Sequence, residues 1–141
     1  MSGLVKRKRF ALVVGRIELY FDVMRETFVD TVFFEGTFMT RLLVLYGHPK
    51  DTDAFDKYYH EVHVPIARRM KGLKKWTIGK VTGTPDGKPA PYYYIADLYA
   101  DSRAAMEAIL ATPEGKAAVA DVPKFASGGV TFVWTEINDV I

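Results

Sequence analysis

A chain of 141 residues, of which 49% are hydrophobic and 26% charged, is long enough to bury one core and is expected to form one main domain. Its net charge of +2 is too small to attract nucleic acid strongly, and no apolar run is long enough to span a bilayer, so we expect neither as a partner. Zero cysteines exclude disulfides and thiolate metal sites and are typical of the reducing cytoplasm, which is the expected location.

Residues 1–39 differ in pattern from the rest of the chain. Apolar residues alternate over residues 17–23, and residues 28–34 are rich in β-branched and aromatic residues, so both segments are candidate strands. A second interpretation is that the compact domain begins near Met39, just before a regular apolar strand. Residues 1–39 would then be an extension added by an upstream mis-start. We expect the folded domain to cover residues 40–141 and leave the order of residues 1–39 open.

From residue 40 onward, strand and helix patterns alternate regularly. Helical spacing covers residues 55–66 and 102–121, and Thr112-Pro113 marks a fresh helix start inside the second segment. Four segments bounded by turn residues are predicted strands: residues 42–46, 75–81, 91–99 and 130–137. The resulting βαββαβ order is the split βαβ arrangement of ferredoxin-like folds in the α+β class.

The first helical segment carries an apolar stripe followed by a proline. Pro65 lacks an N–H, so we expect the helix to kink or stop near residues 62–64 and to restart at Pro65. His63 is predicted at the edge of the stripe, whereas His60 is predicted to point away from it. The stripe consists of Phe55, Tyr58, Tyr59, Val62 and Ile66, at spacings i, i+3, i+4, i+7 and i+11. One helix therefore offers a half-buried tyrosine and a half-buried histidine side by side.

Both faces of the predicted sheet are apolar. In residues 42–46, Leu42 and Val44 face opposite to Leu43 and Leu45. Two crossover helices of this arrangement cover only one face. The other face needs a different cover, and a second copy of the chain packed sheet on sheet is the economical solution, with residues 1–39 as an internal alternative.

The chain resembles the EthD family of dimeric α+β barrels over about residues 40–137, which leaves residues 1–39 unmatched. The features that carry the resemblance are Tyr58-Tyr59-x-x-x-His63-x-Pro65, the following Gly72-Leu73, the aromatic strand from Tyr92 to Tyr99, and Ser102 to Glu114 with Asp121 and Phe125. The resemblance implies a homodimer with two facing four-stranded sheets. The family takes its name from an ether-degradation gene cluster. Its wider superfamily includes polyketide cyclases, lactone isomerases, cofactor-free monooxygenases and haem-binding enzymes, so the fold alone does not choose a reaction.

A cleft between the first helix and the sheet is the expected binding site for a small apolar or aromatic carbonyl compound. His63 is the candidate general base, because an imidazole pKa near 6.5 needs little adjustment for that role. Tyr59 or Tyr58 would donate a hydrogen bond to a developing enolate. Asp97 is a candidate to orient or share a proton, and the candidate substrate-binding residues are Trp76, Tyr92, Tyr94 and Phe55. Such a site suits cofactor-free proton abstraction of the cyclase, isomerase, lyase or monooxygenase-like type.

The same residues also allow a structural interpretation. A histidine at the edge of an apolar helix face often bonds a backbone carbonyl, and the tyrosines and tryptophans are equally typical of packing. No metal site is expected, and haem held by His63 is an alternative by superfamily analogy alone. The alternative function is a non-catalytic binding or accessory protein for a degradative oxygenase pathway, so catalysis itself stays open at this point.

Overall fold

The computed structural model describes residues 9–14, 17–22 and 39–138, and the chain divides into two units, residues 1–34 and 35–141. In the first unit, β1 (Arg9–Val14) pairs antiparallel with β2 (Ile17–Asp22). The strand expected from the alternation over residues 17–23 is therefore present. The strand expected at residues 28–34 lies outside the described residues.

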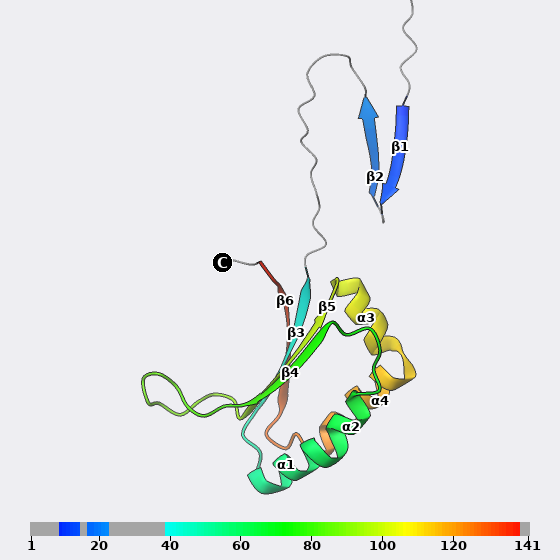
Figure 1. Cartoon of the computed structure of the whole chain (residues 1–141). Helices are drawn as coiled ribbons and strands as arrows, with labels where there is room; N and C mark the ends of the chain where they lie inside the picture. Colours follow the sequence, from blue (N-terminus) through cyan, green and yellow to red (C-terminus); the bar gives the residue numbers. More distant parts are fainter. Residues whose placement is uncertain (1–8, 15–16, 23–38, 139–141) are drawn as a thin grey trace, which may run out of the picture. The chain divides into compact units, whose positions relative to one another are not determined.

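The second unit is built on a four-stranded antiparallel sheet with the strand order β4-β5-β3-β6. Its strands are β3 (Thr40–Tyr46), β4 (Lys75–Lys80), β5 (Tyr94–Ala100) and β6 (Val130–Glu136). The helices of this unit lie together on one side of the sheet (Figure 1). The predicted βαββαβ order and the α+β class are confirmed. Among the described residues, no helix has the length and apolar character needed to cross a bilayer.

The first helical segment is interrupted where the sequence predicts a break. Helix α1 (Thr52–Tyr58) begins at Asp51, whose carboxylate accepts the Ala54 N–H at 3.0 Å. A π-helical turn, η1 (Tyr59–His63), follows, and α2 (Val64–Ala67) completes the segment with a proline in its first turn. Pro65 cannot donate a hydrogen bond and its ring crowds the preceding turn, so a wider turn just before it relieves the clash.

The second helical segment is two helices rather than one, as the Thr112-Pro113 pair predicts. The hydroxyl of Ser102 caps α3 (Arg103–Ala111), and the hydroxyl of Thr112 caps α4 (Pro113–Asp121) by accepting the Gly115 N–H at 3.1 Å. A short 3₁₀ turn, η2 (Val122–Lys124), then leads to Phe125. Asp121 at the end of α4 and Phe125 after this turn both contact His63 of the first helical segment.

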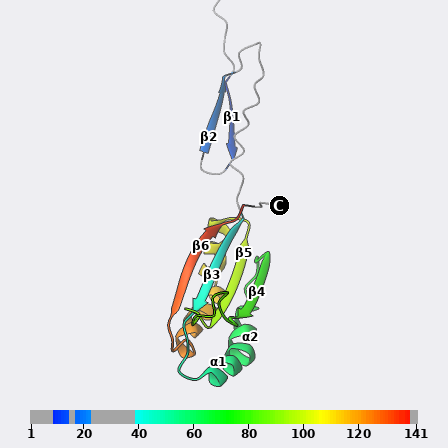
Figure 2. The same ribbon diagram turned by 90° about the vertical axis from the view of Figure 1, so that its left-hand side faces the viewer.

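The sheet has one covered and one uncovered face. Along β3 and β5, buried residues that pack under the helices alternate with partly exposed residues on the other face. Figure 2 shows the uncovered face toward the viewer, with the helices behind it. That face carries the apolar side chains of Leu43, Leu45, Ile95 and Val133, and Val133 is 37% exposed. The prediction that both faces are apolar is confirmed, and no described helix of this unit covers the second one.

Candidate functional site

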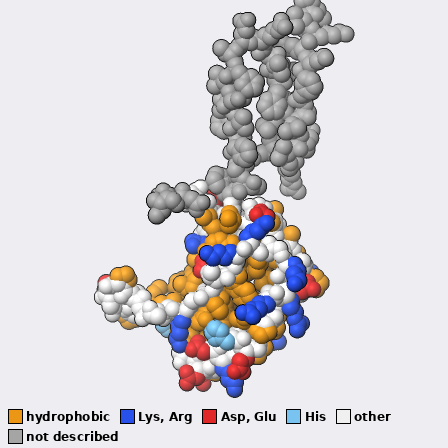
Figure 3. All heavy atoms as spheres, viewed as in Figure 1, with side chains coloured by type: hydrophobic (Ala, Val, Ile, Leu, Met, Phe, Trp, Pro, Cys, Tyr) orange, Lys and Arg blue, Asp and Glu red, His pale blue; other side chains and the backbone are white. Residues whose placement is uncertain are grey.

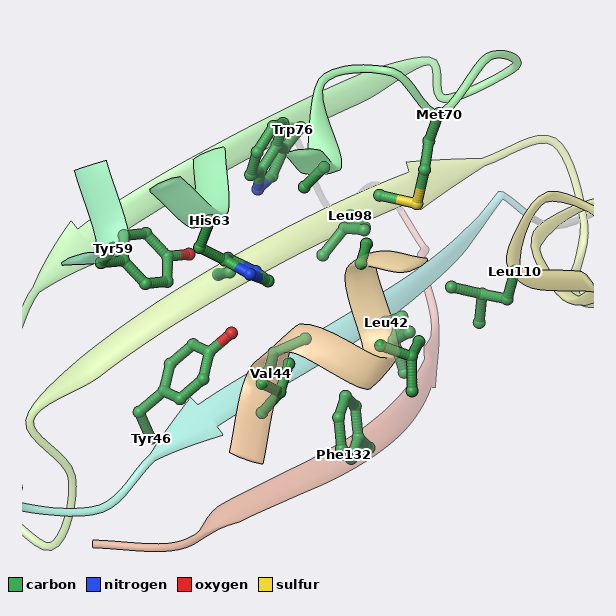
Figure 4. A pocket seen from close by; sticks show the side chains of 15 residues that line it. Leu42, Val44, Tyr46, Tyr59, His63, Met70, Trp76, Leu98, Leu110 and Phe132 are labelled. Atoms are coloured by element: carbon green, nitrogen blue, oxygen red, sulfur yellow. The ribbon is translucent and has the colours of Figure 1, made fainter. Parts of the chain in front are cut away.

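A cavity of about 40 Å³ lies between the helix-facing side of the sheet and the helices (Figure 4). Most of its wall is apolar, including Leu42 and Leu98 from the sheet and Met70 just after α2. Its described lining includes only four side chains with polar atoms: Tyr46, Tyr59, His63 and Trp76. A space of this size holds a few water molecules, so a larger ligand requires side chains to move.

The cavity walls reach the surface at β6 and α4, where Phe132 is 45% exposed and Val119 is 44% exposed. On the side seen in Figure 3, apolar side chains gather at the centre of the unit, with Lys and Arg side chains around them. A haem, the alternative cofactor raised by the sequence, does not fit this cavity. Even drug-sized ligands occupy pockets of about 300 Å³ or more.

His63 is held by a buried carboxylate from the other helical segment. Its Nδ1 lies 3.0 Å from Oδ2 of Asp121, and the two residues are 5% and 2% exposed. The Tyr58 hydroxyl donates to Oδ1 of Asp121 at 2.9 Å, and the Phe125 ring packs 4.7 Å from the imidazole. An ionised carboxylate only accepts, so Nδ1 carries the proton and the neutral ring keeps its lone pair on Nε2.

The charges of this pair suit a base. Burial lowers the pKa of His63 below its ordinary value, although Asp121 acts in the opposite direction. Burial raises the pKa of Asp121, but the hydrogen bonds from His63 and Tyr58 outweigh it and hold that pKa below the usual range. At neutral pH, His63 is therefore a neutral imidazole beside an ionised carboxylate. This is the arrangement in which an imidazole accepts a proton and its partner stabilises the resulting cation.

Two buried donors at the cavity have no partner. Tyr59 is fully buried and its hydroxyl makes no hydrogen bond of normal geometry, although it lies beside the Tyr46 hydroxyl. The indole nitrogen of the half-buried Trp76 is also unpaired. Burial raises the pKa values of Tyr59 and Tyr46, so both hydroxyls keep their protons and act as donors. In Figure 4, Tyr46, Tyr59 and His63 point into the same part of the cavity. Buried polar groups are rarely left unpaired, and both donors are available to an acceptor atom placed in the cavity.

Replacing Tyr59 with phenylalanine should raise the free energy of unfolding by about 1 kcal/mol, because it removes a buried hydroxyl that has no partner. Tyr58→Phe is the matched control on the same helical segment. It removes a hydroxyl bonded to Asp121, so its unfolding free energy should fall. Urea denaturation of both variants measures the difference. A Tyr59→Phe variant as unstable as Tyr58→Phe would contradict the assignment of Tyr59 as an unpaired donor.

The buried imidazole also predicts that stability declines as the pH falls below about 6.5. The unfolded chain protonates His63 at its ordinary pKa, whereas the folded chain does so only at lower pH. Between these two values the unfolded state binds more protons, so the unfolding free energy drops with the pH. Asp121 adds a further loss below about pH 4, because its folded pKa is also held low. Denaturant titrations across this range measure the slope. The dependence of the unfolding free energy on pH should become flat near pH 6 in His63→Gln and should stay as in the wild type in His60→Gln.

The structure brings only part of the predicted site together. His63, Tyr59 and Trp76 line the cavity. Tyr58 lies on the far side of Asp121 and reaches the imidazole only through that carboxylate. His60 is exposed, as predicted, and its Nε2 lies 3.1 Å from the Tyr94 hydroxyl.

The other candidate substrate-binding residues lie outside the cavity lining. Phe55 and Tyr94 pack in the core against the Tyr59 ring, with centroids 5.6 and 4.8 Å from it. Tyr92 precedes β5 and is half-buried. Phe55 and Tyr94 therefore support the ring of Tyr59 from behind instead of contacting the space that a ligand would fill.

Asp97 does not orient His63, which corrects the sequence-based assignment. It lies on the uncovered face of the sheet, 3.7 Å from Arg41, because it alternates with the helix-facing residues Ala96 and Leu98. Asp121 has the orienting role instead, and its side chain was missed as a site residue. One signal could have found it. Asp121 lies in the last turn of a helix, where the helix dipole makes a negative charge unfavourable, so its carboxylate is expected to have a specific hydrogen-bond partner.

With this geometry in place, comparison with known proteins decides the family. The sequence profile of the EthD domain matches residues 48–129. The chain belongs to the EthD family. An uncharacterised 11.0 kDa protein from the thcB-thcC intergenic region of Rhodococcus erythropolis is 41% identical over 103 residues, which are 73% of this chain and 99% of that protein. The matched region includes every residue of the Tyr58–Asp121–His63 cluster, so the cluster belongs to the EthD domain itself.

Solved structures agree with the family and the fold. An EthD family protein from Bacillus halodurans is 32% identical with a TM-score of 0.67, covering 71% of this chain and 99% of its own. A hydroxynitrile lyase from Passiflora edulis is 14% identical with a TM-score of 0.59, and the match covers 74% of this chain and 98% of that protein. A dimeric ferredoxin-like protein from Thermobifida fusca is 17% identical with a TM-score of 0.56, and the match covers 75% of this chain and 96% of that protein. These last two likenesses show the fold alone.

Proposed function

We propose that this EthD protein binds a small apolar carbonyl compound in the cavity and that His63 abstracts a proton from the carbon next to the carbonyl. The observation that carries the proposal is the combination of an imidazole oriented by Asp121 with the unpaired hydroxyl of Tyr59 at one apolar cavity. A base and a hydrogen-bond donor beside the same small space are the groups that enolate formation requires.

In the proposed reaction, the lone pair of His63 Nε2 takes the proton and the electrons of the broken C–H bond move onto the carbonyl oxygen. That oxygen, now an enolate, accepts a hydrogen bond from the Tyr59 hydroxyl. Asp121 stabilises the imidazolium through Nδ1, and Tyr58 keeps the carboxylate in place. Returning the proton to another carbon gives isomerisation, whereas attack of the enolate on a second carbonyl gives ring closure, and loss of a leaving group gives a lyase.

Deuterium exchange tests the proposed step without knowledge of the natural substrate. Small ketones incubated with the protein in D₂O should gain deuterium next to the carbonyl, detected by proton NMR, faster than in buffer alone. His63→Gln should abolish the added exchange because glutamine cannot accept the proton. His60→Gln is the matched control, because His60 is exposed on the same helical segment and does not line this cavity. Full exchange activity in a folded His63→Gln variant would refute the role of His63.

The second candidate function is an accessory protein that binds a hydrophobic compound for a degradative oxygenase pathway without transforming it. The small cavity with two unpaired donors favours it, because binding alone satisfies those donors. Ketone binding without deuterium exchange in the wild-type protein is the result that would select this function over the first.

We also propose a homodimer that covers the apolar face of the sheet. The partly exposed Leu43, Leu45 and Val133 on that face support it, as does the dimeric state of the Thermobifida fusca relative. Light scattering should give twice the mass of the chain, and Leu45→Glu should give one chain mass because it places a charge in the sheet-to-sheet contact. A wild-type protein with the mass of one chain would exclude the dimer.

The domain boundary and the location remain part of the proposal. We propose that residues 40–141 form the EthD domain and that it works in the cytoplasm, where a chain with zero cysteines is common. A truncated chain starting at Met39 should keep the unfolding free energy of the full chain and should still form a dimer, with twice its own shorter chain's mass. Failure of that chain to fold would show that residues 1–38 belong to the domain.

A further inference from the structure

The charges around the cavity restrict the class of compound that it can take, and this restriction deepens the proposed function. The described lining contains no lysine or arginine that could pair with an anion. A negative group lies next to the lining, because the carboxylate of Asp121 bonds the imidazole of His63. Lys124 reaches the other oxygen of Asp121 at 3.4 Å, but it is 65% exposed and does not line the cavity.

A carboxylate placed in such a space would lose its hydration without gaining a cation. Transfer of an unpaired charge into an apolar environment is strongly unfavourable, and the nearby carboxylate adds repulsion. The groups of the site itself follow the same rule, since burial favours the neutral forms of His63, Tyr59 and Tyr46. The cavity therefore disfavours charge on any group that enters it.

The two unpaired groups are both donors. The Tyr59 hydroxyl and the Trp76 indole N–H are buried without partners, so each asks for an acceptor atom from the ligand. The two come from different elements, Tyr59 from η1 and Trp76 from β4, whose register places Trp76 opposite Leu98. An ammonium or a guanidinium group offers only further donors and would leave both groups unpaired.

We infer that the ligand is an uncharged oxygen compound, a ketone or aldehyde without a carboxylate or phosphate, whose oxygen atoms accept hydrogen bonds from the Tyr59 hydroxyl and the Trp76 indole N–H. Trp76 is then a binding residue as well as a packing residue. The compound reaches the site already stripped of ionised groups, so the reaction that supplies it must release a neutral carbonyl product.

Two probes of matched size test this inference. Hexane-2,5-dione is uncharged, and 4-oxopentanoate replaces one of its acetyl groups with a carboxylate. The readout is the indole N–H signal of Trp76 in ¹⁵N-labelled protein, assigned with Trp134→Phe, which removes the other tryptophan. The dione should shift this signal and bind at least about 100-fold more tightly than 4-oxopentanoate. Tyr59→Phe and Trp76→Phe, followed by backbone amide signals, should each weaken dione binding about tenfold.

Comparable binding of the two probes would overturn the inference, as would unchanged dione affinity in both variants or no shift with the dione at its highest soluble concentration. These outcomes separate from those of the proposed function. Selective dione binding without deuterium exchange supports the ligand class and removes His63 catalysis. Deuterium exchange together with equal affinity for the dione and 4-oxopentanoate supports catalysis by His63 and removes the inferred ligand class.

Discussion

Replacing Asp121 with asparagine is expected to slow deuterium exchange by about 10²–10⁴-fold while the protein still folds. Oδ1 of Asp121 accepts from Tyr58 and faces the ammonium of Lys124, which only donates. The amide oxygen of asparagine should therefore occupy that position, which turns its NH₂ group toward Nδ1 of His63. The imidazole must then accept at Nδ1 and carry its proton on Nε2, so the cavity faces a donor instead of a base.

The ¹⁵N chemical shifts of the His63 ring report this change of tautomer directly, independently of activity. Asp97→Asn is the matched control, because Asp97 lies on the other face of the sheet and should leave both exchange and tautomer unchanged. Retention of the original tautomer together with wild-type exchange in Asp121→Asn would show that Asp121 is only a packing partner of the histidine.

Replacing Phe55 with alanine should lower the free energy of unfolding by about 3–5 kcal/mol. Its ring is 2% exposed and packs within 5.3–5.8 Å of the Tyr46, Tyr93, Tyr94 and Phe125 rings. It also stacks on Tyr59 at an angle of 10° between the ring planes. Alanine leaves a hole at the centre of this cluster, and the surrounding rings cannot all move to close it.

Phe132→Ala serves as the control for loss of a phenyl ring. Phe132 is 45% exposed, so its removal should cost about 1 kcal/mol or less. Urea denaturation of the two variants gives the comparison. A loss in Phe55→Ala no larger than that in Phe132→Ala would mean that Phe55 lies at a ligand site instead of in the core, as the sequence-based assignment had it.

The fold was largely predictable from the sequence because strands and helices follow local patterns. Alternation along residues 42–46 separated the two faces of the sheet, and Pro65 located the break in the first helical segment. The caps at Ser102 and Thr112 placed both later helices. Each of these features depends on neighbouring residues only, which a single sequence displays directly.

The site was only partly predictable because it depends on residues far apart in the chain. His63 and Tyr59 share one helical segment, so their proximity was visible. The Asp121 carboxylate lies 58 positions beyond His63, and no local pattern links the two. Asp97 is closer than Asp121 to His63 in the sequence, yet the alternation along β5 places its side chain on the face of the sheet that the helices do not cover.

The π turn at Tyr59–His63 makes the geometry of the site sensitive to the deletion of a single residue. A hydrogen bond from the Val64 N–H to the Tyr59 carbonyl encloses one residue more than an α-helical turn does. Deleting a single codon there, such as that of the exposed Glu61, would let the segment close into a regular α-helix. Every side chain before the deletion would rotate relative to Pro65, and Tyr59, then three positions instead of four before the histidine, would meet it at a different angle.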